Sequence, residues 1–256
     1  MIILIAESKT METYEKRVSR EEYETHRPSG EEYASEIMTN INEMSVADLT
    51  VAVKLSPAMT RRLKQMAYEF PNKHSGLRAM EAYTGVVFKN LAYSTLTLEE
   101  KERADDCVRI ISSLYGWLKP EDIIKPYRLE YNAPLSPDDT PLFQFWRSKV
   151  TVELVRSLQE SAENEILNLL PADAAKCIDW KLVKRFAKVR KVDFLEQSGE
   201  SVRSPHAGRL KALRGELLRE IITNSFTTTR QLHFFSNSRF LPVENYKYSD
   251  RIAYMV

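Results

Sequence analysis

The chain has 256 residues, with 37 Lys or Arg against 36 Asp or Glu, and its net charge of +1 excludes a uniformly basic or acidic protein. Its hydrophobic fraction of 43% is enough for one large core, and no apolar run approaches the roughly 18 to 20 residues that span a bilayer. Only Cys107 and Cys177 are present, which excludes a disulfide scaffold and favours a reducing compartment. We therefore expect a cytoplasmic protein with a single globular domain over residues 1–256.

The first predicted element is a strand over residues 1–6, because MIILIA is short, apolar and rich in branched side chains. The polar residues 7–10 should then form a loop at the carboxyl end of this strand, a common place for binding sites in open α/β sheets. An amphipathic helix is predicted over residues 29–44, which carry acidic residues in the first turn and apolar residues at helical spacing.

Two short helices are predicted over residues 45–70, because Ser56 before Pro57 marks the start of a second helix. The pair would form a helix–turn–helix unit, and the free N–H groups at the start of its second helix could hold a phosphate. The cationic candidates around the turn are Lys54, Arg61 and Arg62. A purely structural helical corner is the alternative.

The remaining predictions alternate between the two kinds of element. Helices are predicted at 74–82, 97–113, 141–162 and 206–224. Strands are predicted at 85–89, 165–170, 188–195, 231–235 and 251–256. This alternation indicates an α/β fold in which helices flank a mixed β-sheet.

Charge is unevenly distributed along the chain. Residues 1–50 hold eleven acidic against five basic side chains, a balance of −6, whereas residues 181–219 hold eleven basic against four acidic ones, a balance of +7. A near-neutral total can therefore hide a basic face that attracts phosphates. The alternative is that these side chains are solvated on different faces.

The segment at 112–131, SSLYGWLKPEDIIKPYRLEY, combines aromatic rings, two prolines and several charges. Its prolines fix φ and remove N–H donors, so the chain between them should follow a defined path. That path would present the candidates Tyr115, Tyr127, Arg128 and Glu130 together. The alternative is a surface connection in which Arg128 and Glu130 pair with each other or cap neighbouring elements.

Residues 114–130, LYGWLKPEDIIKPYRLE, resemble the motif L-Y-G-x-L-(R/K)-P-x-D-x-(I/M)-x-P-Y-R-L-E of the YaaA family of bacterial peroxide-stress proteins. MIILIAESKT at 1–10 is similar to the family's opening strand and S-P-A-K-T turn, AYTGVVFKNL at 82–91 to its Y-x-G-x-V-Y-x-G-L stretch, and LFQFW at 142–146 to its L-Y-x-F-W. The helix carrying Lys211, Arg214 and Arg219 resembles the family's K-x-A-R-G-x-M-x-x-R. These similarities follow the family's order across nearly the whole chain.

Two stretches depart from the family pattern. Ala6, Glu7 and Ser8 stand where the family has Ser, Pro and Ala, so only Lys9 and Thr10 keep that turn. The family's N-L-A-S-(D/N)-E-Y block is represented by residues 168–179, which keep the opening Asn-Leu and lose the final Glu-Tyr pair. The resemblance therefore implies no chemistry for the positions from Pro171 to Asp179.

The resemblance implies a role in resistance to hydroperoxide through binding of double-stranded DNA, largely without sequence preference, which would protect DNA from damage by iron and hydroperoxide. It also implies that residues 45–70 form a helix-hairpin-helix-like DNA-binding element, although the glycine-bearing hairpin usual in such elements is absent. Cationic side chains neutralise phosphates and give an affinity that falls steeply with salt. The predicted DNA-binding residues are Lys9, Lys54, Arg61, Arg62, Arg128, Lys211, Arg214 and Arg219. We expect no catalytic residue, cofactor, metal, membrane contact or stable protein partner, since no hydrolase, zinc-site or phosphate-loop motif occurs.

An enzyme that acts on a small anionic metabolite is the alternative. Its polar pocket would be centred on Lys9 and Arg128, with Thr10, Tyr115, Tyr127 and Glu130 as further groups able to bind or transfer a proton. A pocket of metabolite size would favour the enzyme, whereas an open positive groove would favour DNA.

Overall fold

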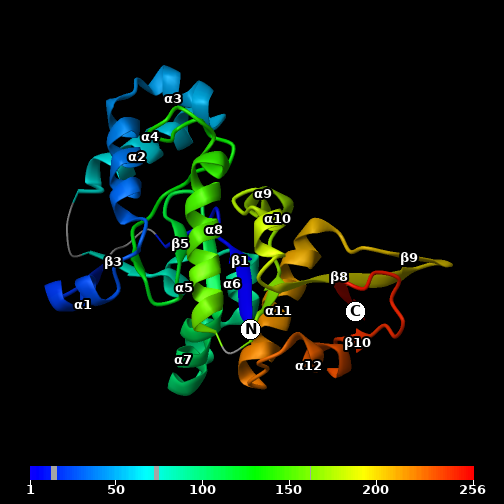
Figure 1. Cartoon of the computed structure of the whole chain (residues 1–256). Helices are drawn as coiled ribbons and strands as arrows, with labels where there is room; N and C mark the ends of the chain where they lie inside the picture. The colour runs from blue at the N-terminus through cyan, green and yellow to red at the C-terminus, as the bar shows by residue number, and fades with distance from the viewer. Residues whose placement is uncertain (13–15, 72–74, 162) are drawn as a thin grey trace.

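The computed structural model describes residues 1–12, 16–71, 75–161 and 163–256 (Figure 1). A mixed sheet flanked by helices forms a single domain, which confirms the predicted fold class. The sheet has the strand order β10-β11-β8-β7-β1-β4-β5, and β9 pairs with β8. Its strands are β1 (Ile2–Ala6), β4 (Val108–Ser112), β5 (Gly116–Leu118), β7 (Glu165–Asn168), β8 (Lys188–Ser198), β9 (Ser201–Arg203), β10 (Leu241–Pro242) and β11 (Arg251–Met255).

The first strand lies in the middle of this sheet because its apolar side chains are buried on both faces. Ile3 and Leu4 have no exposed surface. Ile3 pairs with Val108 of β4, and Ile2 pairs with Ile166 of β7, in both cases in parallel. The carboxyl ends of β1, β4 and β7 therefore meet at one edge of the sheet, and the loops that follow them lie side by side.

A smaller sheet has the order β2 (Lys16–Arg17), β3 (Ser75–Arg78) and β6 (Ile123–Ile124). The helices are α1 (Arg20–Thr25), α2 (Glu31–Glu43), α3 (Val46–Val53), α4 (Pro57–Glu69), α5 (Ala79–Ala82), α6 (Val86–Leu91), α7 (Leu98–Cys107), α8 (Leu142–Glu160), α9 (Ala172–Ala175), α10 (Trp180–Val183), α11 (Ala207–Thr223) and α12 (Thr229–Phe234), with a 3-10 turn at Tyr93–Thr95. No helix in the described parts of the chain is both long and apolar enough to cross a membrane.

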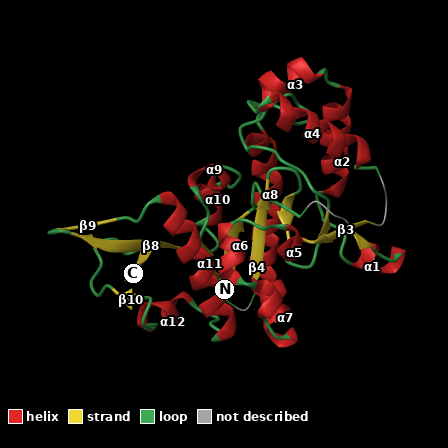
Figure 2. Ribbon diagram, turned by 180° about the vertical axis from the view of Figure 1, so that it is seen from behind, coloured by secondary structure: helices red, strands yellow, loops and turns green. Residues whose placement is uncertain are grey.

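The helices α2, α3 and α4 gather at one end of the molecule, and the hairpin of β8 and β9 projects from the body at the other side (Figures 1 and 2). Between them, α11 packs closely on α6. Gly215 permits this approach, because a Cβ atom there would lie 2.2 Å from the backbone oxygen of Val87. This close packing sets the position of α6 beside the carboxyl end of β1.

Several predicted elements are confirmed with small shifts of their ends. The strand predicted at 1–6 is β1, and the helix predicted at 29–44 is α2. The pair predicted over 45–70 is α3 and α4, where Ser56 caps α4 by accepting the N–H of Met59. The predictions at 141–162 and 206–224 correspond to α8 and α11, although residue 162 lies outside the described residues. The strands predicted at 165–170, 188–195 and 251–256 are β7, β8 and β11.

Four predictions were wrong in whole or in part. Residues 85–89 begin the helix α6 instead of forming a strand, since Phe88 and Leu91 share a buried face beneath α11. Residues 231–235 lie mostly in α12, which is opened by a capping box between Thr228 and Gln231.

The other two corrections concern strands that were assigned to helices. The helix predicted at 97–113 ends at Cys107, because Val108–Ser112 is buried at every position and pairs with β1 as β4. The helix predicted at 74–82 is confirmed only at Ala79–Ala82. Ser75–Arg78 forms β3 instead, where Gly76 lets the backbone approach Ile124 closely, and residue 74 lies outside the described residues.

Candidate functional site

Glu7 occupies the position directly after β1, at the edge where three parallel strands end. Its backbone N–H donates to the carbonyl oxygen of Ile111 at 3.0 Å, which extends the pairing with β4 by one residue. Its carboxylate accepts hydrogen bonds at Oε2 from the backbone N–H of Ser113, at 2.8 Å, and from the hydroxyl of Tyr127. The loop after β4 and the proline-framed segment thus both converge on this carboxylate.

The hydroxyl groups behind Glu7 have a defined direction of proton donation. The Oγ atom of Ser112 accepts two backbone N–H groups, from residues 114 and 115, at 3.1 and 3.0 Å. Its own proton is therefore directed to the hydroxyl oxygen of Tyr127, which lies 2.7 Å away. Because Tyr127 donates its one proton to Glu7, Tyr83, whose hydroxyl oxygen lies 2.6 Å away, is left as the donor in its contact with Tyr127.

Burial and hydrogen bonding have opposite effects on the pKa of Glu7. Burial raises the pKa of Glu7 to about 7, while the hydrogen bonds from Tyr127 and Ser113 lower it and limit the rise. Burial also raises the pKa values of Tyr83, Tyr127 and Tyr131 well above their ordinary range, so these phenols remain neutral donors. Glu7 consequently exchanges its proton near neutral pH, which suits a group that transfers or shares a proton with a ligand.

A cavity of about 420 Å³ opens onto Glu7. Its walls come from the loop after β1, the first turn of α6, the segment Leu129 to Tyr131, the loop after β7, and α11. Gly85 lets α6 approach the loop, since a Cβ atom there would lie 2.1 Å from Oγ of Ser8. We call this space the α11 cavity.

Two cations of α11 line the α11 cavity. Lys211 is exposed, and Arg214 is half-buried one turn further along the helix. Burial lowers the pKa of Arg214. Within the described parts of the chain, neither side chain forms an ion pair with a carboxylate. Both cations are therefore available to an anion that enters the cavity.

A second cavity, of about 180 Å³, lies between α4 and the chain after β1, and we call it the α4 cavity. Arg62 of α4 and Arg128 line it. Lys9 and Thr10 line both the α4 and the α11 cavities, so the two spaces adjoin at this loop.

Two contacts hold the shared loop in place. Nη1 of Arg128 donates to the backbone oxygen of Lys9 at 2.8 Å, and Nζ of Lys9 forms an ion pair with Glu130 at 2.5 Å. The proline-framed segment thus fixes the loop after β1 with one hydrogen bond and one ion pair. The charge of Lys9 is partly compensated by Glu130, whereas the ends of Arg62 and Arg214 are not paired with described carboxylates.

The structure brings together five of the eight predicted DNA-binding residues and separates three. Lys9, Arg62, Arg128, Lys211 and Arg214 line the two adjoining cavities. Lys54 and Arg61 are exposed near the start of α4 but line neither cavity. Arg219 instead donates from Nη1 to the backbone oxygens of Leu91 and Ala92, at 2.8 and 3.3 Å, which caps the end of α6.

The predicted pocket residues also divide. Thr10, Tyr127 and Glu130 lie around the shared loop. Tyr115 is buried, and its hydroxyl accepts the backbone N–H of Lys125 at 3.1 Å. Tyr115 instead lines a third cavity, of about 320 Å³, beside α8.

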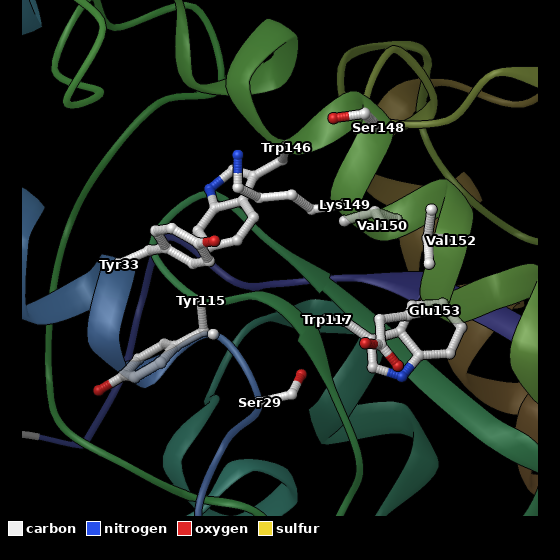
Figure 3. Close-up of a pocket in the computed structure, with 11 residues that line it drawn as sticks. Ser29, Tyr33, Tyr115, Trp117, Trp146, Ser148, Lys149, Val150, Val152 and Glu153 are labelled. Carbon is white, nitrogen blue, oxygen red and sulfur yellow. The ribbon is translucent and has the colours of Figure 1, made fainter.

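Figure 3 shows this third cavity, in which the rings of Tyr33 and Trp146 lie beside the side chain of Lys149. Nζ of Lys149 lies 4.9 Å from the ring centre of Tyr33 and 3.8 Å from that of Phe145, so this cation already packs on aromatic faces. Glu153 pairs with Arg156 at 3.6 Å. The charged side chains that line this third cavity thus have partners, and the α11 cavity is the stronger candidate for a site.

Sequence reasoning missed Glu7, Ser112 and Tyr83. Glu7 was noticed only as a departure from the family pattern, although an acidic residue directly after a buried strand was a usable signal. Within the described residues, no group of three His, Cys, Asp or Glu side chains is arranged to hold a metal ion.

The two cysteines are free thiols, and neither lines the α11 cavity. Burial raises the pKa of Cys107 to about 11 and raises that of Cys177 further. The negative charge of Glu7 also raises the pKa of Cys177.

Known proteins match this chain over nearly its whole length. The family model described as Peroxide stress protein YaaA matches residues 1–250. A UPF0246 protein of Parabacteroides distasonis is 27% identical over 258 residues and covers 100% of this chain and 99% of its own. UPF0246 proteins of Clostridium perfringens and Shewanella woodyi are 27% and 28% identical, and the matches cover 99% and 92% of this chain and 96% and 91% of theirs.

Proposed function

The chain belongs to the peroxide stress protein YaaA family, and from this premise we propose that it binds double-stranded DNA, largely without sequence preference, and thereby protects DNA from damage by iron and hydroperoxide. The proposal places this action in the cytoplasm, where the two free thiols would stay reduced.

One observation carries the proposal. The α4 and α11 cavities share Lys9 and Thr10 in their walls, so cations of α4, of the proline-framed segment and of α11 line two adjoining cavities, which we call the hollow. Phosphates recur along a DNA strand at short intervals, and a row of separate cations is suited to such a regular polyanion. Arg61 and Lys54 would extend this row along the helical corner.

The expected strength of binding follows from the number of free charges. Lys9 is paired with Glu130, which leaves Arg62, Arg128, Lys211 and Arg214 as the cations of the hollow. Each phosphate contact contributes a slope of about −0.9 to the dependence of log affinity on log salt. Four contacts give a slope of roughly −3 to −4, which corresponds to moderate affinity that is lost at high salt.

The test is duplex affinity measured over a salt series. We expect Arg61→Glu with Arg62→Glu, and separately Lys211→Glu with Arg214→Glu, to weaken binding and to flatten the slope by about 1 to 2. The matched control is Arg156→Glu with Arg230→Glu, which changes charge equally at exposed positions outside both cavities. Equal loss in the control, or unchanged binding in both cavity variants, would remove the hollow from the DNA site.

An enzyme acting on a small anionic metabolite is the second candidate. The favouring observation is the α11 cavity, whose size suits one metabolite and whose Glu7 exchanges its proton near neutral pH. The centre of such a site would be Glu7 with Lys211 and Arg214, instead of the expected Lys9 and Arg128. Turnover that is abolished by Glu7→Gln while the fold survives would support it.

A further inference from the structure

The α11 cavity has three chemically different zones. Glu7 supplies the one described carboxylate on its walls that is not engaged by a cation, since Glu130 pairs with Lys9 and Asp173 lies 3.9 Å from Lys176. The backbone N–H of Ser113 and the hydroxyl of Tyr127 both donate to Oε2 of Glu7. Oε1 accepts neither of these two hydrogen bonds, and Glu7 lines the cavity, so Oε1 is the oxygen we assign to a group that enters.

The second zone is cationic. Lys211 is exposed and Arg214 is half-buried, so positive charge extends from the mouth toward the interior along one face of α11. Removing Arg214 from water without a carboxylate partner is unfavourable, and a bound anion would compensate this. A phosphate suits such a pair, because a guanidinium donates two parallel hydrogen bonds and an ammonium adds a point charge.

The third zone is apolar. The apolar side chains that line the cavity include Val86, Val87, Leu169 and Pro171. Val86 keeps 41% of its surface exposed, which leaves apolar area that a ligand could cover. A flat ring that presents hydrogen-bonding groups only at its edge would fit between such walls.

We propose that the α11 cavity binds one nucleotide unit, with its phosphate at Lys211 and Arg214, its base between the apolar walls, and the edge of the base at Oε1 of Glu7. The unit is either a free nucleoside monophosphate or one residue of a nucleic-acid strand. The second form rests on the proposed function, whereas the first does not.

The protonation of Glu7 gives this site a preference among bases. The titratable side chains that face Glu7 are Tyr83, Tyr127, Tyr131 and Cys177, and all four stay neutral around pH 7. Above neutral pH the ionised Oε1 only accepts hydrogen bonds, so it favours bases with an exocyclic amino group over thymine or uracil. Cytosine and uracil are the matched pair, because a carboxylate that faces C4 meets an amino donor in cytosine and a carbonyl oxygen in uracil.

The experiment is calorimetric titration of the full chain at pH 8 with cytidine monophosphate, uridine monophosphate and cytidine. We expect the cytidine monophosphate to bind at least tenfold more tightly than cytidine and several-fold more tightly than the uridine monophosphate. Arg214→Gln should reduce the affinity for both monophosphates at least tenfold. Glu7→Gln, which keeps the acceptor for Tyr127 and Ser113, should abolish the difference between the two bases.

Two controls make the outcome decisive. Lys184→Gln changes an exposed cation outside the cavity and should leave every affinity unchanged, and thermal unfolding of each variant verifies that it is folded. A single-stranded cytidine oligonucleotide and a duplex are titrated in parallel. Binding of mononucleotides without duplex binding would overturn the proposed function and leave this inference standing. This inference alone would be overturned if the duplex bound while Glu7→Gln and Arg214→Gln left the affinity for every mononucleotide and for the single strand unchanged.

Discussion

The hydroxyl of Tyr127 donates a hydrogen bond to the carboxylate of Glu7 across 120 positions of the sequence. This contact joins the loop after β1 to the proline-framed segment at the bottom of the α11 cavity. Because Ser112 and Tyr83 both donate to the oxygen of Tyr127, the donated proton is polarised toward Glu7. The contact keeps a buried carboxylate partly ionised near neutral pH.

Glu7→Gln is expected to change the pH dependence of stability. The folded pKa of Glu7 is raised from 4.5 to about 7, so the folded state binds more protons than the unfolded state between these values. Its contribution to stability is complete below pH 4.5 and is lost as pH rises through 7. The Gln variant should lack this loss. Between pH 4.5 and pH 8, its free energy of unfolding should therefore rise by up to about 3 kcal/mol relative to that of wild type, as measured by urea unfolding. Parallel profiles for the two proteins would contradict the assignment.

Tyr127→Phe is expected to destabilise the fold more than Tyr83→Phe. The first change removes the hydroxyl that donates to Glu7 and that accepts from Ser112 and Tyr83. We expect it to lower the free energy of unfolding by about 1 to 3 kcal/mol at pH 8. The second removes only one outer donor and should lose about 1 kcal/mol or less. Denaturant unfolding of both variants measures the difference, and equal losses would argue against the direction of donation.

Gly215→Ala is expected to destabilise the protein although alanine is the better helix former. The added Cβ would lie 2.2 Å from the backbone oxygen of Val87, so α6 would have to move away from α11. We expect a loss of at least about 2 kcal/mol in thermal or urea unfolding, as for overpacked cores. Gly208→Ala is the control on the same helix. Its nearest atom is a His206 side-chain carbon at 3.2 Å, and stability should stay within about 1 kcal/mol of wild type.

Arg219→Gln is expected to affect stability and not DNA affinity. Its guanidinium caps the backbone oxygens of Leu91 and Ala92, and the loss of this charged donor should destabilise the fold by about 1 to 3 kcal/mol. Duplex affinity of the folded variant should remain within about twofold of wild type. A stable variant with weakened DNA binding would return Arg219 to the site predicted from the sequence.

The elements that could be predicted are those with strong local signals. β1 has an uninterrupted apolar run, α4 has Ser before Pro, and α8 and α11 have long apolar stripes. The predictions for α6 and α12 were wrong because their sequences combine branched or aromatic residues that are typical of strands. Packing on α11 makes α6 helical, and a capping box opens α12. Local propensity is overridden where a short segment is held by its neighbours.

The site was predictable only in part, for a related reason. The motif resemblance pointed to Lys9, Tyr127, Arg128 and Glu130, and these residues do surround one loop. The contact of Tyr127 with Glu7 depends on which strands lie side by side, and no sequence pattern specified that β1 lies between β4 and β7. Arg219 was misleading because a basic residue that caps a neighbouring helix has the same sequence signal as one that faces a ligand.

The raised pKa values of both cysteine thiols have a consequence for a protein of the peroxide stress family. Hydroperoxides attack the thiolate form of cysteine, and a thiol with a pKa of about 11 is ionised to only about one part in ten thousand at pH 7. Cys107 is therefore a slow target for oxidation, and Cys177 is a slower one. Neither thiol is therefore suited to sense hydroperoxide through its own oxidation at neutral pH.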